Sequence, residues 1–356
     1  LKIGDQKFIN AKVDKDEATI LQFMFDEFDL PKGVKVSQAN ICNNIRYVTS
    51  VVDIRESDLS LSVLPLHNPF ETVTAFMTLI YSGATIAFCD NSNVFATMKE
   101  IKPTVLFGDK EFFENLYKNI WVTARKNRRH RKLKRALVWS NFLGTKSIEI
   151  RQKKFKDVLA EYGGRIRIGI LEDPYMNSKL LKKLQNLGIF VIQGYGMDET
   201  SYLAFINHVK KFKNASVGLP IPGVEAEINE PNPEGIGELY IKGKVVTQGY
   251  YGDSEENDDV FSKDGFIKTG NVVYKDSDGF FYVLGKKKNA IVSKAGYSIF
   301  PEEIENRVTG SALIKQCVVY CKQMGNKDEL KVCAIIVPDF TAIETLRGKS
   351  KFDVDL

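Results

Sequence analysis

Short apolar runs alternate with longer segments of periodic apolar residues between residues 59 and 197. Short runs are typical of buried strands, and apolar positions that recur every three or four residues are typical of helices packed on a sheet. Repeated strand–helix units predict an α/β domain with a mainly parallel, helix-flanked sheet. The pattern predicts strands at 59–64, 85–89, 104–107, 166–171 and 189–193, and helices at 70–82, 94–101, 110–126, 148–162 and 178–186.

The pattern changes after about residue 215, where short strands are separated by turn residues. Strands are expected at 224–228, 237–241 and 245–248, with a turn at 231–235 and a hairpin turn at 276–279. These strands predict a small β subdomain. Beyond residue 285 we expect a strand at 290–293, a helix that opens at Pro301, and strands at 313–321 and 330–337.

The chain has 356 residues, which is too long for one ordinary domain. We expect residues 1–214 to form part of a large α/β domain and residues 215–284 to form its β subdomain. Residues 285–356 are then the start of a small, incomplete α+β C-terminal domain. A composition with 44% hydrophobic and 27% charged residues excludes a disordered chain.

The net charge of +5 is mild and does not by itself indicate a nucleic-acid partner. The basic residues are nevertheless concentrated at 125–135, which reads Arg-Lys-Asn-Arg-Arg-His-Arg-Lys-Leu-Lys-Arg. Such a run is typical of a solvated helix end or a linker. A contact with an anionic membrane surface is the second interpretation. A nucleic-acid contact is the least favoured, because no aromatic residues interleave the run.

Five cysteines show neither secretory nor metal-binding spacing: Cys42, Cys89, Cys317, Cys321 and Cys333. No signal peptide and no run of about 18 apolar residues is visible. These features favour a cytoplasmic protein, which is membrane-peripheral if the basic run binds lipid. Because the chain begins with Leu1 rather than Met, we expect it to be a fragment.

Several short segments carry residue types suited to nucleotide chemistry. Residues 194–200 read Gly-Tyr-Gly-Met-Asp-Glu-Thr and follow a predicted strand, as a ligand loop at the carboxyl end of a parallel sheet does. Residues 31–36 read Pro-Lys-Gly-Val-Lys-Val, 64–71 read Leu-Pro-Leu-His-Asn-Pro-Phe-Glu, 269–271 read Thr-Gly-Asn and 285–289 read Gly-Lys-Lys-Lys-Asn. In this order the segments resemble the motifs of the adenylate-forming (AMP-binding) superfamily, most of all those of long-chain fatty-acid–CoA ligases. Residues 237–243 and 249–250 resemble a further, largely structural segment of that family.

This resemblance implies an ATP-dependent ligase of fatty acid metabolism, an acyl-CoA synthetase. In that reaction the carboxylate of a fatty acid, or of another acid, attacks the α-phosphate of ATP to give an acyl-adenylate and pyrophosphate. The thiol of coenzyme A then displaces AMP. ATP or AMP, Mg²⁺ and CoA are therefore the implied cofactors.

The resemblance also implies roles for individual residues. His67 and Glu199 are the expected catalytic residues, and Glu199 is also the expected Mg²⁺ ligand. Asn289 is the expected hinge of the small domain. The expected nucleotide-binding residues are Lys32, Tyr195, Gly196, Asn271 and Lys286, with Tyr195 stacked on adenine and with Asn271 and Lys286 at the ribose. The plainer interpretations are a structural His67 and a simple glycine-rich turn at 194–200.

Several positions depart from the family pattern. Residues 24–29 read Met-Phe-Asp-Glu-Phe-Asp where the phosphate loop has Ser, Thr and Gly, and Asp198 stands where a hydroxyl contacts phosphate. Each carboxylate about 4 Å from a phosphate charge costs roughly 1 kcal/mol at the dielectric of water and about 4 kcal/mol at an effective dielectric of 20. Asn271 and Asn289 each replace an Asp, and residues 171–175 replace a small-residue adenine loop. From the resemblance we also expect the given sequence to lack the amino-terminal part of the large domain and the family's late catalytic Lys.

Two hypotheses follow. The first is an acyl-CoA synthetase whose binding of ATP is impaired by the substituted phosphate loop. The second is a non-catalytic protein on the same scaffold that binds an acyl group, a nucleotide or a partner. A folded remnant without any ligand is a further version of the second.

Overall fold

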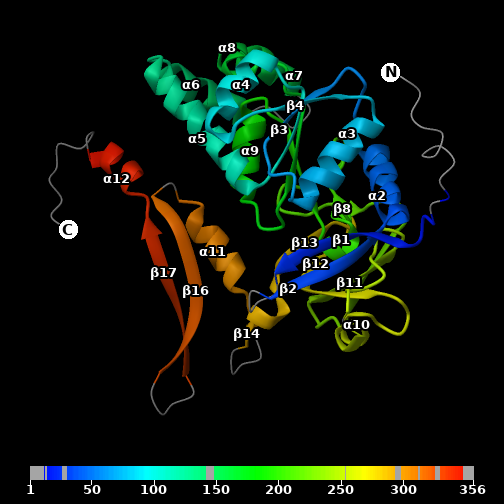
Figure 1. Ribbon diagram of the computed structural model, residues 1–356. Coiled ribbons are helices and arrows are strands. Elements are labelled where there is room, and N and C mark those ends of the chain that lie inside the picture. Colours follow the sequence, from blue (N-terminus) through cyan, green and yellow to red (C-terminus); the bar gives the residue numbers. More distant parts are fainter. Residues whose placement is uncertain are drawn as a thin grey trace.

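The computed structural model describes residues 12, 14–25, 30–141, 148–252, 254–292, 298–311, 313–324 and 329–347 (Figure 1). Its largest sheet has seven strands in the order β4-β3-β5-β6-β7-β8-β9. The first five strands in this order are parallel, β8 is antiparallel to β7, and β9 is antiparallel to β8. The predicted α/β class with a mainly parallel sheet is therefore confirmed. The strands are β3 (Leu59–Ser62), β4 (Thr85–Phe88), β5 (Val105–Gly108), β6 (Ile168–Glu172), β7 (Val191–Tyr195), β8 (Phe205–Ile206) and β9 (Leu219–Pro220).

Three helices have the bounds that the sequence predicts, namely α4 (Val94–Ile101), α5 (Lys110–Lys126) and α9 (Ser178–Asn186). The side chains of Asp109 and Asn177 cap α5 and α9, each by accepting a hydrogen bond from a backbone N–H of the first turn. None of the described helices is long and apolar enough to cross a membrane.

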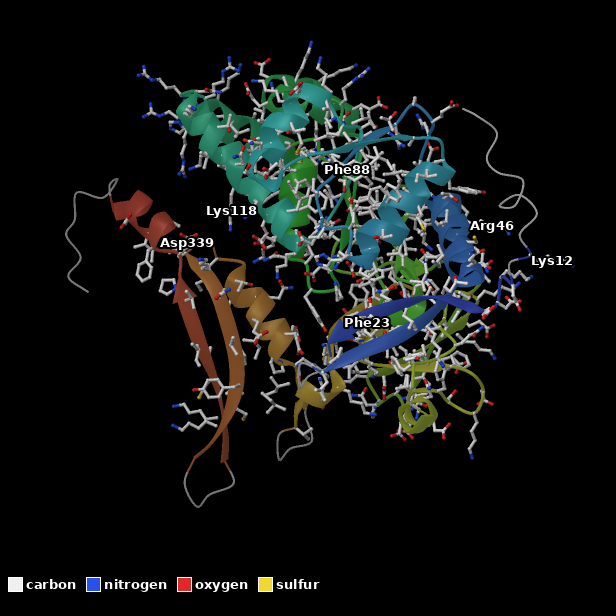
Figure 2. All side chains as sticks on the ribbon, viewed as in Figure 1. Lys12, Phe23, Arg46, Phe88, Lys118 and Asp339 are labelled. Carbon is white, nitrogen blue, oxygen red and sulfur yellow. The ribbon has the colours of Figure 1, made fainter. Side chains whose placement is uncertain are left out.

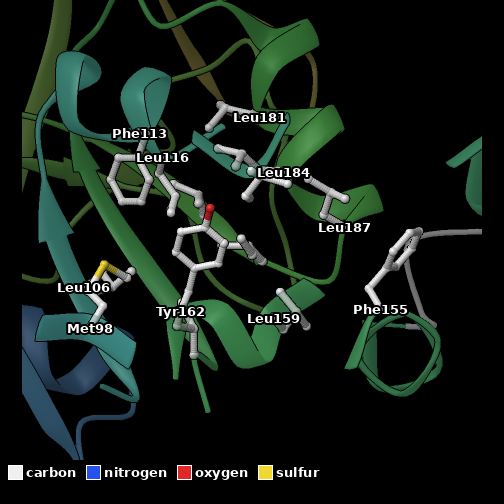
Figure 3. Close-up of a cluster of buried hydrophobic side chains, with 14 of the residues drawn as sticks. Met98, Leu106, Phe113, Leu116, Phe155, Leu159, Tyr162, Leu181, Leu184 and Leu187 are labelled. Carbon is white, nitrogen blue, oxygen red and sulfur yellow. The ribbon is translucent and has the colours of Figure 1, made fainter. Parts of the chain in front are cut away.

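Two predicted helices are more complex than the periodicity indicates. The segment at 70–82 is a π-helix, η1 (Phe70–Met77), continued by α3 (Thr78–Tyr81). The segment at 148–162 is interrupted at Phe155, which is 2% exposed and belongs to the buried cluster of Figure 3. The resulting pieces are α7 (Ile148–Lys154), α8 (Lys156–Leu159) and η4 (Ala160–Tyr162).

Helices cover both faces of the large sheet. Leu106 on β5 lies in a cluster with residues of α4, α5 and α9 (Figure 3). Its neighbours Val105 and Phe107 lie in a second cluster with Val48 of α2 (Gln38–Val51) and Phe70 of η1. This alternation follows from the pleat of a strand, which points successive side chains to opposite faces.

A second, antiparallel sheet has the order β10-β11-β12-β13. The predicted turns join its strands, with Gly235 N–H donating to the Asn232 carbonyl and Gly279 N–H to the Asp276 carbonyl. The strands are β10 (Val224–Asn229), β11 (Gly237–Gly243), β12 (Ile267–Lys275) and β13 (Phe281–Lys286), with α10 (Ser254–Val260) between β11 and β12.

The prediction of a strand at 245–248 is wrong, because these residues form a turn. Side chains, and not a neighbouring strand, form the hydrogen bonds to the backbone carbonyls of this segment. Asn40 Nδ2 donates to the carbonyls of Lys244 and Val246, and Ser201 Oγ donates to that of Val245. Apolar residues in this segment therefore mark a buried turn that fixes α2 and residues 198–201.

The amino-terminal part is a hairpin of β1 (Ala18–Phe25) and β2 (Pro31–Ser37), in which Phe25 pairs with Pro31. Helix α2 follows directly, capped by a reciprocal pair of hydrogen bonds between Ser37 and Asn40. The three acidic residues of the substituted phosphate loop, Asp26, Glu27 and Asp29, lie outside the described residues.

The carboxyl-terminal part contains a long two-stranded ribbon beside α11 (Figure 1). Its predicted helix and strands are present, and we keep the division at 1–214, 215–284 and 285–356 as a proposal. The elements are β14 (Ile291–Val292), β15 (Ser298–Ile299), α11 (Pro301–Thr309), β16 (Ile314–Met324), β17 (Glu329–Pro338) and α12 (Phe340–Arg347).

Candidate functional site

Glu199 lies in a short 3-10 turn, η5 (Asp198–Thr200), just beyond the carboxyl end of β7. The residue is 3% exposed. Its Oε1 accepts a hydrogen bond of 2.6 Å from the Tyr250 hydroxyl. Its Oε2 is buried and has no hydrogen-bond partner among the described residues. Because an unpaired buried carboxylate oxygen is costly, this arrangement indicates a position for a ligand.

The resemblance implies Mg²⁺ at Glu199, and the unpaired Oε2 fits this role. No group of three His, Cys, Asp or Glu side chains is placed to hold a metal ion in the described part of the chain. Mg²⁺ in phosphate sites is, however, usually held by one or two carboxylates together with the phosphates. Glu199 would thus hold the ion jointly with a nucleotide, and the bound ion would neutralise phosphate charge.

Lys32 approaches the same place from β2. Strand β2 pairs with residues 249–251, as Lys35 N–H donates to the Gly249 carbonyl and Tyr251 N–H to that of Gly33. Lys32 Nζ lies 3.7 Å from the centroid of the Tyr250 ring, which is a cation–π contact. Lys32, Tyr250 and Glu199 therefore form one connected set between the amino-terminal hairpin and the loop after β7.

Gly196 is required by the close approach of another backbone segment. A Cβ at this position would lie 1.1 Å from the Tyr202 carbonyl oxygen. Ser201 and Tyr202 both have positive φ, 49° and 90°, which is unusual for residues with side chains. This strained loop directly behind Glu199 is typical of a functional site. The role of Gly196 here is to permit the loop, and contact with a nucleotide stays a prediction.

The structure brings Tyr195, Asn271 and Lys286 together. Asn271 Nδ2 donates a hydrogen bond of 2.9 Å to the Tyr195 hydroxyl and one of 3.0 Å to the Thr269 carbonyl. Asn271 also pairs with Lys286 across the antiparallel strands β12 and β13, which places the two side chains on the same face. Because the amide NH₂ is engaged, the Asn271 Oδ1 is the atom that would accept a hydrogen bond from a ribose hydroxyl.

Tyr195 is only 3% exposed, and its ring meets Phe205 edge-on with 5.8 Å between centroids. Burial raises the pKa of Tyr195, so the hydroxyl stays protonated. Stacking of an adenine on this ring stays a prediction, and it requires the ring to become more exposed.

Two further carboxyl groups lie beside the loop. Asp198 Oδ1 accepts a hydrogen bond of 2.7 Å from Gln22 Nε2 on β1. Burial, followed by the charge of Glu199, raises the pKa of Asp198 to about 6. Burial and the carboxylates of Asp198 and Asp173 raise the pKa of Glu172, at the end of β6, to about 8. At neutral pH we therefore expect Asp198 to be ionised and Glu172 to be protonated.

The expected hinge residue, Asn289, ends a 3-10 turn, η6 (Lys287–Asn289). Asn289 Nδ2 donates a hydrogen bond of 2.5 Å to Glu302 Oε1 in the first turn of α11. Lys287 Nζ forms an ion pair of 2.7 Å with Glu238 on β11. The turn is therefore tied to both β11 and α11, and its role as a hinge stays a prediction.

His67 lies apart from these residues. It is exposed, in the loop between β3 and η1. This loop and η5 follow the carboxyl ends of β3 and β7, so both lie at the same edge of the sheet. In the strand order β3-β5-β6-β7 the two strands are three positions, or about 14 Å, apart. His67 and Glu199 thus share an edge but not a contact, and the catalytic role of His67 stays a prediction.

Glu71, four residues beyond His67, is buried at 2% exposure in the π-helix. Its Oε1 accepts a hydrogen bond of 2.5 Å from Ser62 Oγ, and its Oε2 is buried without a partner among the described residues. Burial raises the pKa of Glu71 from 4.5 to about 7, against the opposing effect of the hydrogen bonds from Ser62 and the Leu64 N–H. The carboxyl group is therefore partly protonated at neutral pH.

We expect the substitution Glu71→Gln to remove the contribution of Glu71 to the pH dependence of stability. Between pH 4.5 and about 7 the folded protein binds a proton that the unfolded chain has released, so the free energy of unfolding falls as the pH rises. The total loss is about 3 kcal/mol. Urea denaturation at pH 5 and pH 8 should show a loss of stability that is smaller in Glu71→Gln than in the wild type by about this amount. The exposed control Glu56→Gln should behave as the wild type, and an unchanged pH dependence in Glu71→Gln would contradict the assignment.

Sequence reasoning missed three contributors to the site. Tyr250 belongs to a segment expected to be structural, yet its hydroxyl fixes Glu199. Gln22 carried no signal, and the departure at 171–175 did not indicate that Glu172 lies near Asp198, because these partners are far apart in the sequence. The Gly-Tyr pair at 249–250 and the altered segment at 171–175 were the available indications.

Comparisons with known proteins show the family of the chain. The family model for AMP-binding enzymes matches residues 30–251. Long-chain-fatty-acid–CoA ligase FadD15 of Mycobacterium bovis is 27% identical over 305 residues, covering 81% of this chain and 50% of the relative. Peroxisomal long chain acyl-CoA synthetase 6 of Arabidopsis thaliana is 27% identical over 341 residues, covering 88% and 47%. The chain thus spans about half the length of these relatives.

Solved structures show the same fold. ATP-bound MatB from Rhodopseudomonas palustris superposes with a TM-score of 0.72 at 20% identity, covering 96% of this chain and 63% of that one. O-succinylbenzoate coenzyme A synthetase (MenE) from Bacillus subtilis, in complex with ATP and magnesium ion, gives a TM-score of 0.71 at 21% identity. It covers 92% of this chain and 61% of that one.

Proposed function

Because the chain belongs to the AMP-binding enzyme family and is similar to acyl-CoA synthetases, we propose that its site binds an adenine nucleotide and a fatty acid or another carboxylate. The reaction is the ATP-dependent formation of an acyl-adenylate, followed by transfer of the acyl group to the thiol of CoA. The observation that carries this proposal is the buried Glu199, whose Oε2 has no partner among the described residues while Tyr250 holds its Oε1.

Each residue of the site has a task in this proposal. Glu199 holds Mg²⁺ together with the phosphates, and Tyr250 fixes the direction of its carboxylate. Lys32, on β2, neutralises phosphate charge. Asn271 and Lys286 bind the ribose from adjacent positions of β12 and β13. The carboxylate substrate approaches from the side of His67, which lies at the same edge of the sheet.

We further propose that Mg·ATP binds weakly. Asp198 is ionised at neutral pH and stands where the family has a hydroxyl that contacts phosphate. A carboxylate offers no donor to a phosphate oxygen and repels its charge. The acidic residues 26, 27 and 29, known from the sequence alone, act in the same direction.

A second candidate is a non-catalytic protein that binds an acyl group, AMP or a partner at this site. The specific observation that favours it is the Gln22–Asp198 hydrogen bond, which ties β1 to the loop after β7. A carboxylate and its donor thereby occupy the place where the family has a phosphate-contacting hydroxyl.

Calorimetry with AMP and with Mg·ATP, together with ATP–pyrophosphate exchange in the presence of palmitate, tests both candidates. The first predicts that AMP binds, that Mg·ATP binds only in the millimolar range, and that exchange requires palmitate. Binding of palmitate or AMP with no exchange at saturating ATP would establish the second candidate. Micromolar binding of Mg·ATP would overturn the proposed weakness.

A further inference from the structure

The basic run at 125–135 folds into an exposed surface on two helices. It spans the last turn of α5, a turn at 127–129 and the first half of α6 (His130–Asn141). Figure 2 shows nitrogen-tipped side chains that project from this region away from the body of the protein. We call the following exposed residues the basic surface: Arg125, Lys126, Arg128, Arg129, Arg131, Lys132, Lys134 and Arg135.

Helix α6 has one face in the core and one face in solvent. Leu133 and Ser140 are buried, and Ala136 and Leu137 are half-buried, at the spacing of one helix face. The opposite face carries Arg131, Lys134 and Arg135, followed one turn later by Val138. The helix therefore packs on the core through its apolar face. Its solvent-exposed face carries cations in the first half and an apolar residue one turn later.

Exposed apolar side chains border these cations. Val138 is 55% exposed, Trp139 44%, and Ile150 on α7 52%. The Lys154 ammonium lies over the Trp139 ring at 5.2 Å from its centroid, which places α7 beside this end of α6. Val122 on α5 is 59% exposed and lies one turn before Arg125 and Lys126. Packing leaves these groups uncovered in the described structure.

Few carboxylates neutralise the basic surface. The whole chain has a net charge of +5, whereas this segment alone contributes eight Lys and Arg residues, so the rest of the chain is net negative. Helix α6 contains no Asp or Glu. Within the described residues, the basic surface has one ion pair, between Arg129 and Asp157 at 4.0 Å, and both side chains are exposed.

We propose that the basic surface, together with Val138, Trp139 and Ile150, binds the headgroup region of an anionic lipid bilayer. Each Lys or Arg near an anionic membrane surface contributes about 1 kcal/mol. Apolar side chains among the cations enter the boundary between headgroups and acyl chains, where tryptophan is enriched. This surface lies outside the nucleotide site, so the inference does not depend on the proposed function.

A nucleic acid fits the same charges less well. Single strands are bound by aromatic rings on which successive bases stack, interleaved with cations. The basic run contains no aromatic residue, and Trp139 lies four residues beyond its end.

Co-sedimentation of the 356-residue chain with lipid vesicles tests the proposal. We expect binding to phosphatidylcholine vesicles that contain phosphatidylglycerol, weaker binding at higher salt, and no binding to phosphatidylcholine alone. The triple variant Arg131→Gln, Lys134→Gln, Arg135→Gln should lose about a hundredfold in affinity. Its matched control, Lys210→Gln, Lys263→Gln, Lys315→Gln, loses the same charge from exposed lysines elsewhere and should bind as the wild type. Circular dichroism should show equal helix content in both.

Tryptophan fluorescence gives a second readout. The chain has two tryptophans, so Trp121→Phe leaves Trp139 as the sole reporter. Its emission should shift to shorter wavelength with anionic vesicles and not with neutral ones. Equal binding to both kinds of vesicle, no effect of the triple variant, or a single-stranded RNA that binds more tightly than the vesicles and displaces them would each overturn the proposal.

Discussion

The substitution Asp198→Thr is expected to tighten the binding of Mg·ATP by about a hundredfold. It removes a carboxylate that is ionised at neutral pH, whose repulsion of a phosphate charge at about 4 Å costs roughly 1 to 4 kcal/mol. It also introduces a hydroxyl donor, and a hydrogen bond to a charged phosphate contributes about 1.5 kcal/mol. A total near 3 kcal/mol corresponds to about a hundredfold in the dissociation constant, which calorimetry measures directly.

Two further variants separate the contributions at this position. Asp198→Asn removes the charge without adding the hydroxyl and keeps an acceptor for Gln22, so we expect about a tenfold gain. Asp264→Thr is the matched control, since it makes the same change at an exposed site remote from the nucleotide loop. If neither Asp198 variant binds Mg·ATP more tightly than Asp264→Thr, Asp198 does not face the phosphates and the explanation for weak binding fails.

Glu172 should contribute little at neutral pH, although it lies close to Asp198. Its pKa of about 8 means that it already carries a proton at pH 7. Glu172→Gln is therefore expected to change Mg·ATP affinity by less than about threefold at pH 7. A larger gain at pH 9 than at pH 7 would agree with this protonation state.

Much of the fold could be predicted from the sequence because its signals are local. The bounds of α4, α5 and α9 follow from apolar periodicity, and Asp109 and Asn177 mark the starts of α5 and α9. The segment at 245–248 was misjudged for a physical reason. Its apolar residues suit a strand, but side chains from distant segments bind its backbone.

The candidate site was predictable only in part. Motifs identified Glu199, Tyr195 and Asn271, and the structure adds that Tyr195 and Asn271 are hydrogen-bonded to each other. The partners Tyr250 and Gln22 lie 51 and 176 residues away from the acids that they hold. Pattern and propensity act over a few residues, so contacts at such separations appear only once the sheet and the hairpin are assembled.

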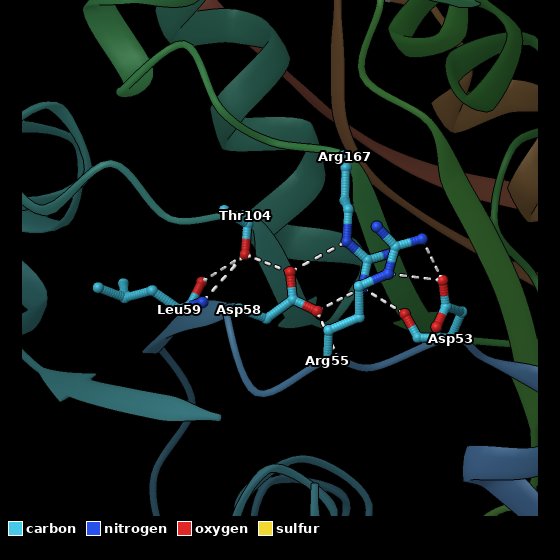
Figure 4. A network of polar contacts seen from close by, with 6 residues as sticks. All are labelled: Asp53, Arg55, Asp58, Leu59, Thr104 and Arg167. Carbon is cyan, nitrogen blue, oxygen red and sulfur yellow. Dashed lines mark hydrogen bonds and ion pairs between the residues drawn. The ribbon is translucent and has the colours of Figure 1, made fainter. Parts of the chain in front are cut away.

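Beyond the site, an ion pair between the buried Asp58 and the partly exposed Arg167 holds the amino-terminal edge of the large sheet (Figure 4). Asp58 is 3% exposed and accepts hydrogen bonds from Thr104 Oγ1 at 2.7 Å, from the Arg55 N–H at 2.8 Å and from Arg167 Nε at 3.0 Å. Burial disfavours its charge, but the bonds from Arg167, Thr104 and Arg55 prevail and lower the pKa of Asp58. This carboxylate links β3, β5 and the segment before β6.

The substitution Asp58→Ala is therefore expected to lower the free energy of unfolding by about 4 kcal/mol at pH 7, because it leaves the donors of Thr104 and Arg167 without their acceptor. Urea denaturation should show a lower midpoint. The control Asp53→Ala removes an exposed partner of the same network and should cost at most about 1 kcal/mol. Since the folded pKa of Asp58 is depressed, its contribution is present above the unfolded pKa and is lost as the pH falls through the folded pKa. The difference in the free energy of unfolding between Asp58→Ala and the wild type should thus shrink below about pH 4. Equal urea midpoints for Asp58→Ala and Asp53→Ala at pH 7 would show that the Asp58–Arg167 pair does not secure the sheet edge.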